Sequence, residues 1–274
     1  MGRQFHADNR MKKLDFSRNF LKMKTQLLII TIYILAILFN LLFLCSCDKI
    51  DETYDQSSKN LTNGKTKALF NPNVTYGVMT DQDGNIYKTV IIGKQTWMAE
   101  NLRTTKYNDG TAIPNVTATN EWTNLNNGSY CDYNNTSSID TISTYGRHYN
   151  WFAVETGKLA PKGWHVPSDE EWSILTNNLG GESIAGDKLK EIGIIHWTVL
   201  NNGATNESGF TALPAGCRGD FGMFINNGNF GSWWCSTRYN ATNAWNRGMS
   251  YYNCDVGRYN TNKNIGYSVR CIKD

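Results

Sequence analysis

The sequence predicts an α+β domain built from two helices, short antiparallel strands and long loops. Three observations support this class. A strongly signalled helix starts at Ser168, short extended segments separated by Asn-Gly turns follow Trp197, and 24 glycines against five prolines indicate many tight turns. A chain of 274 residues with 12% aromatic residues can bury a substantial core.

An apolar run near the N-terminus has the arrangement of an export signal. Residues 27–44 are almost entirely apolar, and Lys22 and Lys24 precede them. A basic head followed by such a run is typical of a secretory signal peptide, although the run is also close to the length of a membrane span. Initiation of translation at Met23 would give a signal peptide of ordinary length. One interpretation is therefore that the start codon is misassigned and that residues 1–22 lie upstream of the true start.

A cysteine after this run predicts a lipid anchor. Ser46-Cys47 resembles the lipobox of bacterial lipoproteins, in which a small residue precedes the cysteine that receives diacylglycerol. We expect residues 1–46 to be a signal peptide and Cys47 to carry the lipid, with an uncleaved anchor as the alternative. Residues 47–67 are polar and without periodicity, which indicates a flexible tether.

The acidic residues directly behind Cys47 resemble the export signal of surface lipoproteins. We therefore expect a cell-envelope protein that is lipid-anchored to the outer membrane. Exposure on the cell surface and a position facing the periplasm both stay open.

An Asp-Gly turn predicts a β-hairpin at the start of the domain. Asp83-Gly84 separates two extended runs, and glycine accepts the positive φ that such a turn requires. Asp81, Asp83 and Asn85 also alternate as in a calcium loop, but Ile92 occupies the position of the required bidentate glutamate. We therefore interpret these residues as a turn and predict no metal.

The strongest helix signal is a capping box. Ser168 is placed at the N-cap and Glu171 follows three residues later, while Trp172, Leu175 and Leu179 form one apolar stripe. Two glycines after this stripe end the helix.

A weaker pattern predicts a second helix over residues 184–192, in which Leu189 and Ile192 face inward. Beyond it, extended segments and turns continue to a last strand over residues 265–272.

Six short motifs resemble a known family. They occupy residues 83–87, 92–102, 145–151, 163–172, 208–216 and 266–271. In this order they are similar to the Fibrobacter succinogenes major paralogous domain, a family of exported bacterial proteins that are often lipoproteins. The resemblance implies one domain over residues 68–274 and, more distantly, a C-type-lectin-like or formylglycine-generating-enzyme-like fold. It implies no activity, cofactor or substrate.

The candidate catalytic residues favour a non-catalytic protein. His148, His165 and His196 lack metal-ligand spacing, and the chain has no nucleophile-elbow motif. The five cysteines beyond Cys47 form no close pair like the copper-binding pair of the formylglycine-generating enzyme. We interpret His165 as structural and predict neither a metal nor a cofactor. An exported enzyme with dispersed active-site residues remains an alternative.

Exposed aromatic residues predict a binding patch in the C-terminal third. Neighbours in a strand face opposite sides, so one of Trp233 and Trp234 is expected to point outward. The candidate patch consists of Trp233, Trp234, Trp245, Tyr251 and Tyr252. A glycan or a protein would be its ligand, and the competing interpretation is that these rings fill the core.

The cysteines beyond the lipid site are disulfide candidates, because thiols outside the cytoplasm tend to oxidise. They are Cys131, Cys217, Cys235, Cys254 and Cys271. The resemblance implies a cysteine just before the Pro of the Gly-Trp-His segment, where this chain has Ala160, so Cys271 needs another partner or stays free. The odd number leaves one thiol unpaired within a monomer.

Charge excludes one class of partner. Basic residues are concentrated before Cys47, and the rest of the chain carries more acidic than basic residues, unlike a nucleic-acid-binding domain. The sequence thus predicts a lipid-anchored binding or adhesion module, with an enzyme or a purely structural envelope protein as alternatives.

Overall fold

The computed structural model describes residues 65–201 and 203–274. These residues belong to the second of the two units into which the chain divides, Lys59–Asp274. The predicted signal peptide, Cys47 and almost all of the tether lie outside the described residues, so these predictions stay untested. Within the described part of the chain, no helix is both long and apolar enough to cross a bilayer.

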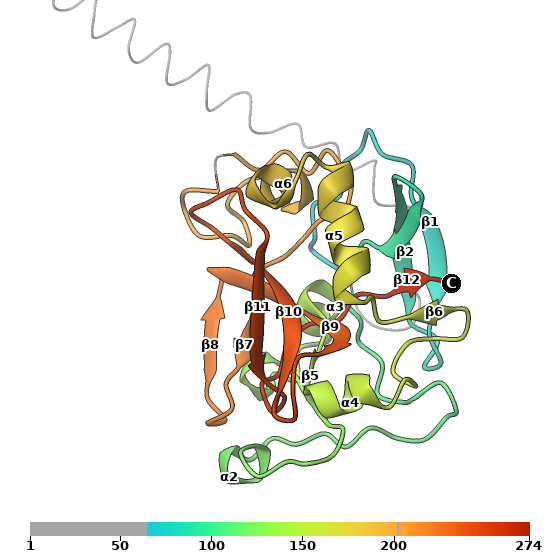
Figure 1. Cartoon of the computed structure of the whole chain (residues 1–274), viewed down its shortest axis with the longest axis vertical. Helices are drawn as coiled ribbons and strands as arrows, with labels where there is room; N and C mark the ends of the chain where they lie inside the picture. Colours follow the sequence, from blue (N-terminus) through green and yellow to red (C-terminus); the bar gives the residue numbers. More distant parts are fainter. Residues whose placement is uncertain (1–64, 202) are drawn as a thin grey trace, which may run out of the picture. The chain divides into compact units, whose positions relative to one another are not determined.

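One five-stranded sheet joins the start of the domain to its end (Figure 1). Its antiparallel strands, in spatial order, are β1 (Gly77–Thr80), β2 (Ile86–Ile92), β3 (Gln95–Met98), β12 (Ile272–Lys273) and β6 (Trp164–His165). The predicted hairpin is confirmed, because β1 pairs with β2 and Gly84 in the turn has a φ of 82°.

A second five-stranded sheet contains the C-terminal third. Its spatial order is β11 (Gly257–Asn262), β10 (Asn243–Ser250), β9 (Phe230–Arg238), β7 (Ala215–Arg218) and β8 (Phe224–Asn227). All neighbours are antiparallel except β7 and β9, which are parallel. A small third sheet pairs β4 (Tyr130–Cys131) with β5 (His148–Tyr149).

Both predicted helices are present. The first, α5 (Asp169–Asn178), carries the expected capping box between Ser168 and Glu171. The second, α6 (Glu182–Leu189), ends three residues before the predicted end, because Lys190 adopts an extended conformation. Leu189 is buried as expected, whereas the prediction that Ile192 faces inward is wrong, since Ile192 is exposed.

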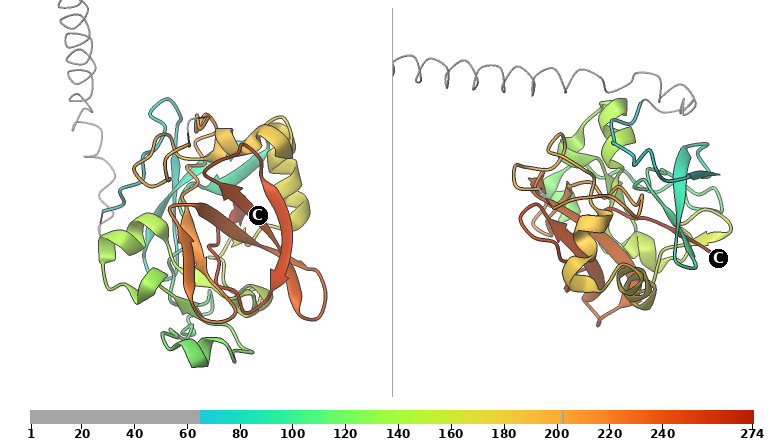
Figure 2. Two further views of the ribbon diagram at one scale, coloured as in Figure 1. Left: turned by 90° about the vertical axis from the view of Figure 1, so that its left-hand side faces the viewer. Right: turned by 90° about the horizontal axis from the view of Figure 1, so that it is seen from above.

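Short helical segments were not predicted from the sequence. They are α2 (Thr119–Trp122), the 3₁₀ turn η2 (Tyr133–Asn135), α3 (Ile139–Tyr145) and α4 (Trp151–Glu155). Each is too short to display an apolar stripe over several turns. The domain is therefore a mixture of helix and sheet that is mostly β. The blue-green and the orange-red strands occupy different sides of it (Figure 2, right).

Residues from several sequence motifs meet at the buried side-chain amide of Asn101. Asn101 Oδ1 accepts hydrogen bonds from Trp233 Nε1 at 2.8 Å and from Arg270 Nε at 2.9 Å. The Asn101 amide nitrogen donates to the Tyr145 carbonyl at 2.8 Å. The guanidinium of Arg270 also donates to the Thr211 carbonyl at 2.8 Å. Polar groups from four motifs thus hydrogen-bond to one another in the interior, where an unpaired polar group would be costly.

Aromatic rings surround this polar centre. Trp172 of α5 packs against Trp97 of β3, with ring centroids 4.9 Å apart, and against Phe210 at 5.8 Å. The Arg270 guanidinium lies over the Phe210 ring, 4.1 Å from its centroid. These contacts show that residues from the sequence motifs build the core.

Candidate functional site

The two adjacent tryptophans lie on opposite faces of β9, as expected, but neither reaches solvent. Trp233 is fully buried against Trp172, with ring centroids 6.2 Å apart. Trp234 is fully buried on the other face, where its ring meets Tyr267 at 4.7 Å. The prediction that one of them points outward is therefore wrong. Strand β9 lies inside the sheet and both of its faces are covered, one by α5 and the other by the segment containing Tyr267.

The other three patch candidates are divided between two places. Trp245 is half-buried under the guanidinium of Arg258, 3.5 Å from its ring centroid, and contacts the Tyr239 ring. Tyr251 and Tyr252 lie edge to face at the end of β10, and Tyr252 also contacts Phe230. The five predicted residues do not form one surface.

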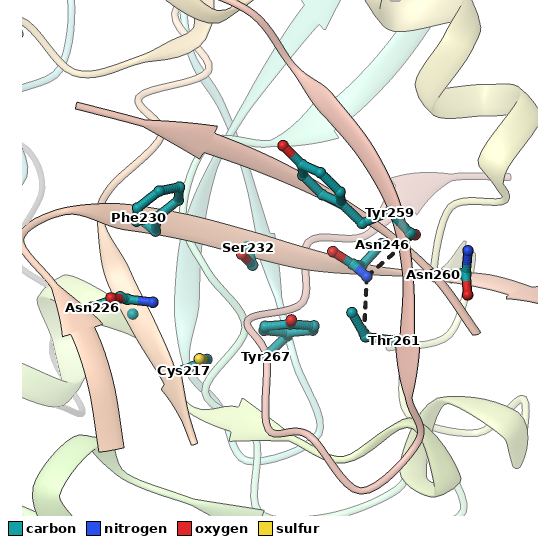
Figure 3. A pocket seen from close by; sticks show the side chains of 10 residues that line it. Cys217, Asn226, Phe230, Ser232, Asn246, Tyr259, Asn260, Thr261 and Tyr267 are labelled. Atoms are coloured by element: carbon teal, nitrogen blue, oxygen red, sulfur yellow. Dashed lines mark hydrogen bonds between the residues drawn. The ribbon is translucent and has the colours of Figure 1, made fainter. Parts of the chain in front are cut away.

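A hollow of about 380 Å³ on the second sheet is the best candidate site (Figure 3). We call it the sheet groove. Its lining residues are Gly216, Cys217, Asn226, Phe230, Ser232, Asn246, Tyr259, Asn260, Thr261 and Tyr267.

Glycines allow close packing around the sheet groove. Gly248 of β10 has no side chain, and the ring of Tyr259 extends over it from β11, so that an added Cβ would lie 3.2 Å from the ring. Gly216 of β7 has a φ of 65°, and a Cβ there would lie 2.4 Å from the Ile225 carbonyl oxygen. Ser232 of β9 lies between them. A side chain at either glycine would therefore press against the Tyr259 ring or against the backbone of β8.

Aromatic rings border the sheet groove. Tyr259 is 53% exposed, and Phe230 is partly buried on the other side of the groove. Tyr267 lies in the floor and rests on Trp234, whose indole nitrogen donates to the Tyr149 carbonyl at 2.8 Å. The buried tryptophan thus supports the groove and does not contact a ligand there.

Neutral hydrogen-bonding groups complete the lining. The amide nitrogen of Asn246 donates to Thr261 Oγ1 at 3.0 Å and to the Tyr259 carbonyl at 3.3 Å. These bonds orient the amide, and its oxygen points away from Thr261 (Figure 3). Asn226 and Asn260 add two further amides. Amides can both donate to and accept from a hydroxyl-rich ligand.

No lining residue carries a charge near neutral pH. Burial raises the pKa of the Cys217 thiol to about 12, so that it stays protonated. Burial also raises the pKa of the Tyr267 hydroxyl, as it does for Tyr259. The electrostatics of the sheet groove therefore suit an uncharged ligand that offers hydroxyl groups and an apolar face.

A second hollow, of about 330 Å³, differs in its chemistry. There Arg147 and Asp132 form an ion pair with 2.5 Å between Nη1 and Oδ2, and the Arg147 guanidinium lies over the Tyr130 ring. Burial raises the pKa of Asp132, although Arg147 opposes this effect. The pair neutralises itself, and both carboxylate oxygens of Asp132 already accept hydrogen bonds from Arg147.

The five disulfide candidates are free thiols in the structure. Burial raises the pKa of Cys131, Cys217 and Cys235 to about 12, and it also raises the pKa of Cys271. Cys254 is partly exposed, and its sulfur lies 3.2 Å from the Ser183 carbonyl oxygen. Cys235 and Cys131 belong to different core clusters.

The calcium-like residues serve the hairpin turn. Asp81 accepts hydrogen bonds from the backbone of Asp83 and Asn85 and from the Tyr87 hydroxyl. Asp83 accepts from the Thr105 hydroxyl at 2.9 Å. Among the described residues, no group of three or more His, Cys, Asp or Glu side chains is arranged to hold a metal ion.

His165 links the capped helix to the C-terminus. Its Nε2 lies 2.8 Å from Glu171 Oε1, and its Nδ1 lies 2.6 Å from Asp274 Oδ1. Partial burial disfavours the charged ring, but the two carboxylates outweigh it and raise the pKa of His165. This arrangement agrees with a structural role.

A pH-dependent contribution from His165 follows. Because the folded-state pKa is raised, its stabilising effect is complete below about 6.5, the pKa of an unfolded histidine, and is lost as pH rises through the folded-state pKa. We expect His165→Gln to lower the free energy of unfolding at pH 5.5 by about 1 kcal/mol or less, since solvent screens the pair. Urea unfolding at pH 5.5 and 9 should show a smaller loss at pH 9, and equal losses would contradict this role.

These structural features define a mostly β domain with a neutral groove on its C-terminal sheet. The model of the Fibrobacter succinogenes major domain matches residues 90–273, and the chain belongs to this family. The match starts within β2 and includes every residue that lines the groove. Comparison with curated proteins and with solved structures gave no match.

The groove lies in the same third of the chain as the predicted aromatic patch, but none of the five predicted residues lines it. The sequence does not reveal which face of a strand α5 covers. For that reason the tryptophans attracted attention, while Tyr259 and the asparagines did not.

Proposed function

We propose that the protein is a non-catalytic binding module that recognises uncharged glycans through the sheet groove. The observation that carries this proposal is the lining itself, which combines aromatic rings with three asparagine amides and has no charged group. Sugars present hydroxyl groups at their edges and apolar C–H faces, so amides and aromatic rings are suitable partners. The exposed face of Tyr259 would stack on a sugar ring, and the amides of Asn226 and Asn246 would bind its hydroxyl groups.

The proposal includes the cellular location. A lipid on Cys47 would anchor the module to the outer membrane, where envelope or surface glycans are available. The export-signal pattern before Cys47 and the membership in a family of exported domains support this location.

It also includes the finer architecture. We propose a C-type-lectin-like or formylglycine-generating-enzyme-like fold. The first sheet supports this architecture, because it contains both β1 from the start of the domain and β12 from its end.

Removal of the stacking ring tests the binding site. We expect Tyr259→Ala to weaken glycan binding by about 2 kcal/mol, or about thirtyfold, because an exposed aromatic platform often contributes most to such a site. The measurement is binding of the unit 59–274 to an array of neutral, acidic and basic glycans. Tyr239→Ala is the matched control, because Tyr239 is similarly exposed, at 50%, and does not line the groove.

Two outcomes would contradict the proposal. One is equal loss of binding in both variants, and the other is binding restricted to charged glycans. Denaturation of both variants checks that their folds remain intact.

Metabolic labelling tests the anchor separately. We expect a palmitate analogue to label the wild-type chain and the Cys45→Ala variant, but not Cys47→Ala, because Cys47 follows the small residue Ser46, whereas Cys45 follows the bulky Leu44. Labelling of Cys47→Ala would contradict lipid attachment at this residue, whatever the glycan array shows.

A further inference from the structure

An apolar loop of residues 192–200 protrudes from the domain. Its exposed aliphatic residues are Ile192, Ile194, Ile195, Val199 and Leu200, each between 47% and 64% exposed. Single apolar side chains on a surface are ordinary, but five within nine residues form a patch that requires a partner.

The loop is held firmly in this outward position. Trp197 is buried at its centre, and its indole nitrogen donates to the Ala212 carbonyl at 3.0 Å. The amide of Asn201 donates to the carbonyls of Glu191 and Gly193, at 2.8 and 2.9 Å. The aliphatic side chains are therefore presented to the outside by a fixed backbone.

The chain enters the domain beside this loop. The backbone N–H of Leu69 donates to the buried carboxylate of Glu191 at 2.6 Å, directly before the loop. Leu69 is itself 37% exposed, and Lys65 and Lys67 are exposed just before it. Cationic side chains next to an apolar patch suit anionic lipid headgroups.

An exposed tyrosine, Tyr252, follows a residue that is linked to the apolar loop. Asn229 connects the two segments, since its side chain accepts from Thr198 Oγ1 at 2.7 Å and its carbonyl accepts from the Tyr251 N–H at 3.0 Å. The next residue, Tyr252, is 59% exposed. Tyrosine rings favour the boundary between lipid and water.

We propose that the apolar loop inserts into the surface of the bilayer that carries the lipid anchor. The inference rests on the proposed attachment at Cys47. Seventeen residues separate Cys47 from Lys65, and a chain of this length spans at most about 60 Å. The anchor therefore keeps the domain near the membrane, and the loop lies where the tether arrives. Contact would bury aliphatic side chains that are otherwise in water.

A fluorescent label on the loop tests this contact. The full lipidated chain, in a Cys254→Ser background, carries an NBD group on Ile194→Cys and is reconstituted into phosphatidylethanolamine–phosphatidylglycerol vesicles. We expect the emission to shift to shorter wavelengths and to be quenched by spin-labelled lipid. Ile91→Cys is the matched control, because Ile91 is 72% exposed on β2, and its emission should stay water-like.

The outcomes separate the two proposals. Water-like emission at position 194 in vesicle-anchored protein would overturn the loop contact alone, whereas protein that does not stay with the vesicles would overturn the anchor and the loop contact together. A shift that requires high protein concentration but no vesicles would indicate a second copy as the partner and would also overturn the inference. As a second variant, I194S/I195S should weaken vesicle association of a non-lipidated chain that starts at Asp48, and so lacks the apolar run of residues 27–44, by about tenfold or more, and unchanged association would contradict the inference.

Discussion

Replacing Asn101 with alanine is expected to lower the free energy of unfolding by on the order of 3–5 kcal/mol. The change removes the acceptor shared by Trp233 Nε1 and Arg270 Nε, at 2.8 and 2.9 Å. It also removes the donor to the Tyr145 carbonyl. The Arg270 guanidinium is buried, and burial already lowers its pKa to about 9. Losing a partner of a buried cation is far more costly than losing an exposed hydrogen bond.

Chemical denaturation of matched variants measures this effect. Asn124→Ala is the control, because the Asn124 amide makes an exposed bond to the Asn120 carbonyl at 2.7 Å. We expect this variant to change stability by about 0.5 kcal/mol or less. Similar midpoints for the two variants would show that Asn101 does not hold the motifs together.

His148 is expected to destabilise the fold by about 3 kcal/mol as pH falls from 7 to 4. Burial lowers the pKa of its imidazole to about 4, and the nearby Arg218 acts in the same direction. The folded state therefore holds the ring neutral. The unfolded state takes up a proton below about pH 6.5 and is favoured as pH falls further.

A variant without the titrating ring isolates this contribution. The stability of His148→Gln, measured by urea unfolding at pH 7, 6, 5 and 4, should fall less steeply than that of the wild type. The difference in the free energy of unfolding between the wild type and the variant should change by about 3 kcal/mol across this pH range. Parallel curves would mean that His148 is not held neutral. His165 has the opposite effect on the pH dependence of stability, because its raised pKa makes it stabilising at low pH.

The local signals of the sequence predicted the first hairpin and the two longer helices. Ser168 and Glu171 form the expected capping box, and Gly84 occupies the expected turn with positive φ. Such features depend on a few neighbouring residues, so the sequence alone is sufficient. The end of α6 differed, because Lys190 leaves the helix and pairs with Ala212 from a distant segment.

The candidate site depended on contacts that are remote in sequence. Period-two alternation correctly separated Trp233 from Trp234, but whether each face is covered depends on α5 and on Tyr267. The sheet groove combines residues of different strands, such as Asn246 of β10 opposite Tyr259 of β11, a relation set by strand register. The family motifs gave no help here, because their residues mainly build the core.

Mapping a bound glycan by NMR tests the central claim most directly. The isotope-labelled unit 59–274 is titrated with a neutral oligosaccharide that the array identifies. We predict that the largest chemical-shift changes occur at the side-chain amides of Asn226 and Asn246 and around Tyr259. Changes centred instead on the hollow with Asp132 and Arg147, with the sheet groove unaffected, would contradict the account.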